Sequence, residues 1–119
     1  MNRIVLIGLV LVCVVFIVYK LKTSLGANQT QLKEKIDGGA LVVDVRTTAE
    51  FQSGHFPGAI NIPVDQVSKR LDEFGDKNRS IVVYCASGGR SGSAKSFLES
   101  VGFVDVINAG GLSNMPNPE

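Results

Sequence analysis

The sequence predicts one α/β domain with a mostly parallel sheet, preceded by one N-terminal membrane helix. Short apolar runs that end in turn residues alternate with stretches of helical spacing, a pattern typical of layered α/β domains. The first apolar run differs from the others, because residues 4–19 contain no charged side chain. The rest of the 119-residue chain is long enough to bury one core but not two.

The N-terminal segment, residues 1–24, is predicted to be a membrane anchor. A chain inside a bilayer must satisfy its own backbone hydrogen bonds, so the run 4–19 would cross as a helix. At about 1.5 Å per residue this run reaches roughly 24 Å, less than the ~30 Å hydrocarbon core. The alternative is a signal segment with small residues at 24–27, which would be cleaved on export to the periplasm. Because the flanking charges are nearly balanced, either side of the membrane stays open.

Charge and cysteine usage exclude two classes of protein. Residues 1–27 carry three basic residues and no acidic one, whereas the remainder carries nine basic and eleven acidic residues. A weakly acidic domain without a basic stripe is not expected to bind nucleic acid. Cys13 lies in the apolar run and Cys85 in the domain, so no disulfide framework is predicted. Cys85 is then either a small buried packing residue or a reactive thiol.

The domain is assigned to residues 31–119 and follows a linker over residues 25–30. Its first helix is predicted over 31–36, a brief amphipathic stretch that ends at glycines. The apolar run 40–45 is typical of a strand that is covered on both faces, as strands are in parallel sheets.

The middle of the domain predicts shorter elements. Thr47 and Glu50 have the spacing of a capping box, which should open a short helix that contains Phe51. A turn-rich stretch then leads to a short strand predicted over 59–62. The apolar residues of 64–71 keep helical spacing, so a helix is expected there.

The last third repeats the order of strand and helix. Residues 81–84 predict a second buried strand, and apolar residues at i, i+3, i+4 and i+7 predict a helix over 92–101. The final strand is predicted over 104–108, and residues 113–119 are predicted to form a loosely packed tail. In parallel sheets ligands bind beyond the carboxyl ends of the strands, so the segment that follows 81–84 is the candidate site.

That segment, residues 85–91, combines a thiol with features that stabilise negative charge. Gly88 and Gly89 let the backbone curl so that successive amides can point inward, next to the positive end of a helix. Arg90 can add a cation beside the sulfur. These effects should lower the pKa of Cys85 below its usual value of about 8.5 and leave the sulfur ionised and open to solvent. The sequence therefore favours a nucleophile that also binds an incoming anion.

At this point the sequence resembles the rhodanese sulfurtransferases. The resemblance spans roughly residues 31–112 and is most specific for the small, exported, phage-shock-type members with one domain. The motifs that carry it, in chain order, are 43–46, 50–51, 54–63, 83–91 and 108–112.

The resemblance implies a rhodanese-like fold with a sheet of about four or five strands, and Cys85 as the sulfur carrier. The Cys85 thiolate would attack the outer sulfur of thiosulfate, sulfite would leave, and the persulfide would pass its sulfur to cyanide or a thiol. The residues implied in binding the persulfide and the anionic donor are Ala86, Ser87, Gly88, Gly89, Arg90 and Ser91. No cofactor and no metal are implied, and a monomeric domain is expected.

Three further polar residues have two interpretations each. Asp44 and Arg46 match a family pair near the site, and they either support the charge of the loop or form a structural ion pair, which we expect. His55 could pair with the thiol, but a structural hydrogen bond is the expected role. Thiosulfate chemistry needs no general base, because the leaving sulfite is already an anion.

Other functions remain to be weighed against sulfur transfer. Cysteine phosphatases and arsenate reductases resemble this layout but place five residues between Cys and Arg, whereas four separate Cys85 from Arg90. A non-enzymatic rhodanese-like binding module would typically lack the cysteine. A persulfide relay that accepts sulfur from a protein partner uses the same cysteine and stays open.

Overall fold

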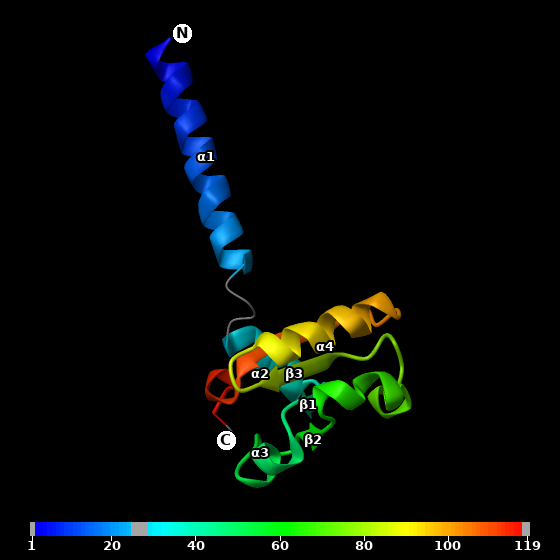
Figure 1. Cartoon of the computed structure of the whole chain (residues 1–119). Helices are drawn as coiled ribbons and strands as arrows, with labels where there is room; N and C mark the ends of the chain where they lie inside the picture. The colour runs from blue at the N-terminus through cyan, green and yellow to red at the C-terminus, as the bar shows by residue number, and fades with distance from the viewer. Residues whose placement is uncertain (1, 25–28, 118–119) are drawn as a thin grey trace.

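The computed structural model describes residues 2–24 and 29–117, and a parallel sheet lies at the centre of its globular part (Figure 1). Within the described residues the sheet has four strands in the order β2-β1-β3-β4. Their bounds are β1 (Leu41–Asp44), β2 (Ile60–Asn61), β3 (Ile81–Cys85) and β4 (Val106–Gly111). The predicted α/β class and parallel sheet are therefore confirmed.

The central strand β3 is buried along its whole length, which explains its continuous apolar sequence. It pairs with β1 on one side, where Val83 faces Val43, and with β4 on the other. Because successive side chains of a strand point to opposite faces, β3 contributes to two cores. Val83 and Cys85 belong to one core, and Val82 and Tyr84 belong to the other.

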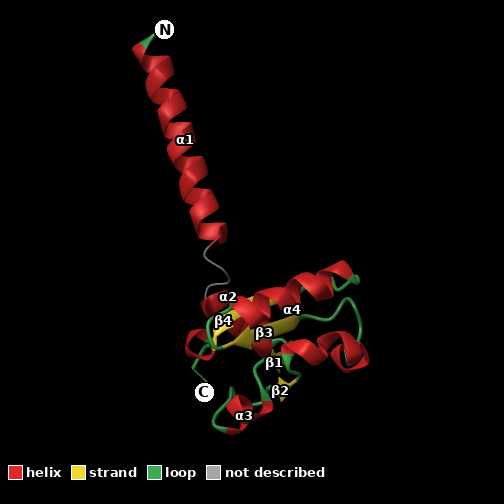
Figure 2. Ribbon diagram, in the orientation of Figure 1, coloured by secondary structure: helices red, strands yellow, loops and turns green. Residues whose placement is uncertain are grey.

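Helices cover both faces of the sheet (Figure 2). The helix α4 (Gly89–Ser100) packs its Ala94 and Leu98 into the core that contains Cys85. The helix α2 (Gln29–Asp37) buries Leu32 in the core on the other face. The predicted helix over 31–36 is confirmed as α2.

The short helix α3 (Thr48–Gln52) begins as the sequence predicts. Thr47 is its N-cap, and its side chain accepts a hydrogen bond from the Glu50 amide while the Glu50 carboxylate accepts from the Thr47 amide. This reciprocal pair satisfies two donors that the first turn would leave unpaired.

The segment 64–71 is helical, but it is not the predicted α-helix. It forms the 3₁₀ segments η1 (Val64–Lys69) and η2 (Leu71–Phe74), separated at Arg70. Val64, Val67 and Leu71 lie three and four positions apart, which is α-helical spacing, so nothing in their spacing indicates the tighter 3₁₀ turns. Val67 and Phe74 are the buried residues of these segments.

Three boundaries in the second half of the domain differ from prediction. The helix α4 begins at Gly89 rather than residue 92, so the end of the segment 85–91 is helical. The strand β4 begins at Val106 rather than residue 104, and Val104 before it is 71% exposed. The predicted loose tail is wrong for 113–117, because the 3₁₀ turn η3 (Leu112–Asn114) brings Met115 into a core. Residues 118–119 lie outside the described residues.

The predicted linker 25–30 falls largely outside the described residues. Residues 25–28 are not described, and Gln29 and Thr30 already form the first turn of α2. The Gln29 side-chain amide donates a 3.0 Å hydrogen bond to the carbonyl oxygen of Asn114, which ties this turn to the C-terminal end of the domain.

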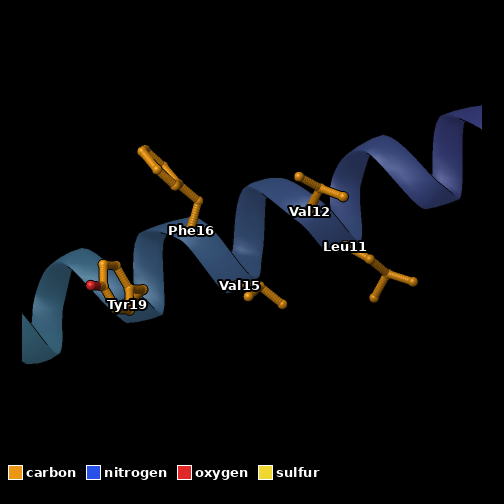
Figure 3. Close-up of a pocket in the computed structure, with 5 residues that line it drawn as sticks. All are labelled: Leu11, Val12, Val15, Phe16 and Tyr19. Carbon is orange, nitrogen blue, oxygen red and sulfur yellow. The ribbon is translucent and has the colours of Figure 1, made fainter.

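The helix α1 (Arg3–Ser24) extends away from the sheet as a separate rod (Figure 1). Its side chains over residues 4–19 are exposed. Figure 3 shows five of them that line one shallow pocket along the helix: Leu11, Val12, Val15, Phe16 and Tyr19. Across the ranges that the structure describes, no helix combines the length and the apolar character needed to cross a membrane. The predicted membrane helix is therefore corrected, in keeping with an apolar run of roughly 24 Å against a ~30 Å hydrocarbon core.

We predict that Gly111→Ala destabilises the domain by about 1–3 kcal/mol, because its Cβ would lie 2.3 Å from the carbonyl oxygen of Ala86. The backbone of Gly111 and that of Ala86 cannot move apart without disturbing the pairing of β3 with β4. Gly89→Ala is the matched control, since its Cβ would meet nothing within 4 Å. Urea unfolding measures both variants, and equal midpoints for Gly111→Ala and Gly89→Ala would contradict the prediction.

Candidate active site

The sulfur of Cys85 lies at the carboxyl end of β3 and accepts hydrogen bonds from the segment that follows. We call residues 85–91 the Cys85 loop. The Gly88 amide donates to Sγ at 2.9 Å, and the Ser91 hydroxyl lies 3.3 Å from it. A sulfur with hydrogen-bond donors on it is stabilised as the thiolate.

The conformation of Gly88 directs this amide at the sulfur. Gly88 has φ of 99°, in the left-handed region that only glycine adopts at low cost. A Cβ there would also lie 3.3 Å from the Cα of Gly110, so both strain and space require glycine. Gly88 is the N-cap of α4, and the unpaired amides of the first turn follow it directly. The backbone curl expected for this segment is therefore present at Gly88.

The pKa of the Cys85 thiol is lowered to about 7 by its surroundings. Burial of the sulfur raises the pKa, but hydrogen bonds from the Ser91 hydroxyl and from the amides of Ser91, Ser87 and Gly88 outweigh it. A substantial fraction of the thiol is thus ionised at neutral pH.

The prediction that the sulfur is open to solvent is wrong. Cys85 is only 1% exposed, whereas Ala86, Ser87 and Gly89 around it are exposed. Cys85 belongs to the apolar core that also contains Val83 and Ala94, beneath the exposed residues of the loop. A donor therefore meets the loop before it meets the sulfur.

Asn108 on β4 holds the Cys85 loop in place, and sequence reasoning missed this role. Its side-chain oxygen accepts a hydrogen bond from the Gly110 amide at 2.9 Å and lies 2.7 Å from the Ser91 hydroxyl, whose single proton is shared between this oxygen and the Cys85 sulfur. Its side-chain nitrogen donates to the Gly88 carbonyl oxygen at 3.1 Å. The position of Asn108 in the final strand was the available signal, because parallel strands end at the same edge of a sheet.

Arg90 does not act as a free cation beside the thiolate. Its guanidinium donates two hydrogen bonds to the Glu50 carboxylate, at 2.7 and 3.0 Å. These bonds raise the pKa of Arg90, and the nearby Cys85 sulfur adds a smaller effect in the same direction. The same bonds, with those from Thr47, lower the pKa of Glu50 to about 2. Glu50 is the second site residue that sequence reasoning missed.

Asp44 and Arg46 form a buried ion pair at the end of β1. The guanidinium donates to the Asp44 carboxylate at 2.7 Å and to the Gly54 carbonyl oxygen at 2.7 Å. It also lies over the Tyr84 ring, whose hydroxyl accepts a hydrogen bond from the Phe56 amide. The structural ion pair that the sequence favoured is thus present and holds the turn after α3.

His55 is exposed and bonded within its own turn. Its Nδ1 lies 2.9 Å from the Phe51 carbonyl oxygen, and its ring stacks on Phe51 with centroids 3.7 Å apart. Among the residues that the structure describes, no group of three or more His, Cys, Asp or Glu side chains could hold a metal ion. Both cysteines are free thiols.

Comparison with known proteins assigns this arrangement to a family. The family model for the rhodanese-like domain matches residues 28–115. PspE of Escherichia coli, a thiosulfate sulfurtransferase, is 42% identical over 78 residues, which cover 65% of this chain and 75% of PspE. A sulfurtransferase of Allochromatium vinosum is 39% identical over 71 residues, which cover 60% of this chain and 65% of that protein.

A solved structure gives the same answer for the fold. A rhodanese from E. coli, solved with anions, is 41% identical and superimposes with a TM-score of 0.64 over 67% of this chain and 95% of its own. The chain therefore belongs to the rhodanese-like domain family. Within this family it is similar to PspE, as the sequence predicts.

We expect Ser91→Ala to raise the pH at which Cys85 is half ionised from about 7 by roughly one unit, because one donor to the sulfur is lost. The rate of iodoacetamide alkylation against pH measures this value, in a Cys13→Ser background so that one thiol reacts. Ser93→Ala, an exposed serine of the same helix, is the control. An unchanged midpoint in Ser91→Ala would show that the hydroxyl does not stabilise the thiolate.

Asp44→Asn should lower the free energy of unfolding by about 3–5 kcal/mol, because it leaves the buried Arg46 charge without a counter-charge. The control is Asp37→Asn, which breaks an exposed pair with Lys33 and should cost less than about 1 kcal/mol. Chemical denaturation of both variants tests this, and an equal loss in the two would contradict the structural role of the buried pair.

Proposed function

We propose that the protein is a thiosulfate sulfurtransferase that carries sulfur as a persulfide on Cys85. One observation carries the proposal: the Cys85 sulfur accepts hydrogen bonds from Gly88 and Ser91 in a loop whose residues Ala86, Ser87 and Gly89 are exposed. A thiolate held in this way is a nucleophile, and the amides that hold it can also stabilise the persulfide anion.

The reaction proceeds in two steps that balance. The Cys85 thiolate attacks the outer sulfur of thiosulfate, a new S–S bond forms, and sulfite leaves with the electron pair of the broken bond. Cyanide or a thiolate then attacks the outer sulfur of the persulfide and releases the Cys85 thiolate. No proton transfer is required in the first step, which agrees with the structural position of His55.

Support also comes from the relatives. PspE is a thiosulfate sulfurtransferase, and the E. coli rhodanese of similar fold was solved with anions. The proposed donor-binding residues are the loop amides from Ala86 to Ser91, which follow the sulfur and begin α4. Asp44 and Arg46 would support the site indirectly by holding the turn after α3.

Intact-mass spectrometry tests the proposal directly. Incubation of the full chain with thiosulfate should add one sulfur atom, and cyanide should remove it and yield thiocyanate. Cys13→Ser should keep this gain, whereas Cys85→Ser should lose it while its circular dichroism spectrum stays unchanged. The absence of any sulfur adduct on the folded wild-type protein would favour a non-enzymatic binding module instead.

We further propose that the N-terminal segment 1–24 serves export rather than anchorage. The support is its exposed apolar helix and the small residues at 24–27 of the sequence. Expression in bacteria followed by N-terminal sequencing of the periplasmic fraction should find a chain that begins after this region. Recovery of the full-length chain from the cytoplasmic or membrane fraction, with none in the periplasmic fraction, would contradict export.

A further inference from the structure

The pairing of Glu50 with Arg90 carries an inference about the sulfur donor, and this inference rests on the proposed sulfur transfer. The two side chains lie 40 positions apart in the sequence but form two hydrogen bonds at the edge of the Cys85 loop. Both are about one-third exposed, so a donor that reaches the Cys85 loop from solvent can meet the charges of this pair. Arg90 is itself a residue of that loop, five positions after the sulfur.

Glu50 is fixed from a second side. Its Oε1 accepts hydrogen bonds from the amide and the hydroxyl of Thr47, at 3.2 and 3.1 Å, as part of the capping box of α3. The carboxylate is therefore not a loose side chain that swings aside when an anion arrives. Displacing it would break bonds to Arg90 and also disturb the start of α3.

This fixed pair changes the charge that a donor meets. Arg90 offers no net positive charge while Glu50 neutralises it, and the other arginine that follows a strand at this edge, Arg46, is neutralised by Asp44. A dianion such as thiosulfate also meets the negative charge of Glu50 itself. A donor with one negative charge or none meets a weaker repulsion.

We propose that Glu50 is a specificity-determining residue that weakens the binding of dianionic donors, thiosulfate included, relative to persulfides of low charge, so that thiosulfate is used but is not the preferred donor. In the favoured reaction the Cys85 thiolate attacks the outer sulfur of a thiol persulfide. A bond forms between the two sulfurs, the bond within the donor breaks, and the donor leaves as its thiolate. The proton of the neutral persulfide stays on the transferred sulfur, so atoms and charge balance.

Steady-state kinetics with two donors test this role in the full chain. The donors are thiosulfate and hydroxyethyl persulfide, which carries at most one negative charge, with cyanide as the acceptor. Glu50→Gln should lower the KM for thiosulfate by about fivefold and change its kcat by less than about twofold. The KM for the persulfide should change by less than about twofold. Added salt should shrink the gain with thiosulfate, because screening weakens the repulsion that Glu50 causes.

Glu73→Gln is the matched control, because Glu73 on η2 forms the same kind of pair with Arg70, which precedes η2. It should leave both KM values unchanged. A rise of the thiosulfate KM in Glu50→Gln would overturn the proposal and show that Glu50 positions Arg90 for the dianion. Equal changes in the KM values for thiosulfate and for hydroxyethyl persulfide would also overturn the proposal. Failure of the wild-type protein to transfer sulfur from either donor would instead reject the proposed function.

Discussion

The hydrogen bond from the Gly88 amide to the Cys85 sulfur is the interaction on which the site depends. It forms because the backbone turns through the left-handed region at Gly88 and points the amide back toward the end of β3. The first turn of α4 begins immediately afterwards, so the unpaired amides of a helix N-terminus lie next to the same sulfur. One glycine thus joins the strand that carries the nucleophile to the helix that stabilises its charge.

The sheet holds this turn rigidly from the opposite side. Gly88 approaches Gly110 of β4 closely, and Asn108 on the same strand bonds both the Gly88 carbonyl and the Ser91 hydroxyl. The pairing of β3 with β4 is irregular at this edge, where Cys85 faces Gly111. The last strand is therefore a structural partner of the loop, and its small residues leave room for the loop backbone.

The sequence predicted the elements whose signals are local. Apolar runs predicted β1 and β3 because buried parallel strands need no alternation, and Thr47 with Glu50 predicted the start of α3 through their own reciprocal bonds. The contacts of Ser91 with Asn108 and of Arg90 with Glu50 were not predictable, since they join residues 17 and 40 positions apart. For this reason Arg90 was expected to be a free cation.

Two further predictions were wrong because the sequence pattern of the segment does not determine its conformation. The apolar residues of 64–71 are three and four positions apart, as in an α-helix, but the chain forms 3₁₀ turns there that bury Val67 and Phe74. The polar composition of 113–119 gave no sign that Met115 would be buried, because that depends on where η3 directs the chain.

The central claim is that loop amides stabilise a negative charge on the Cys85 sulfur, and NMR tests it most directly. The backbone amide proton of Gly88 should shift with pH along a single titration with a midpoint near about 7. The same amide should not titrate in Cys85→Ser. A flat response of the wild-type Gly88 amide between roughly pH 5 and 9 would mean that no thiolate forms against it.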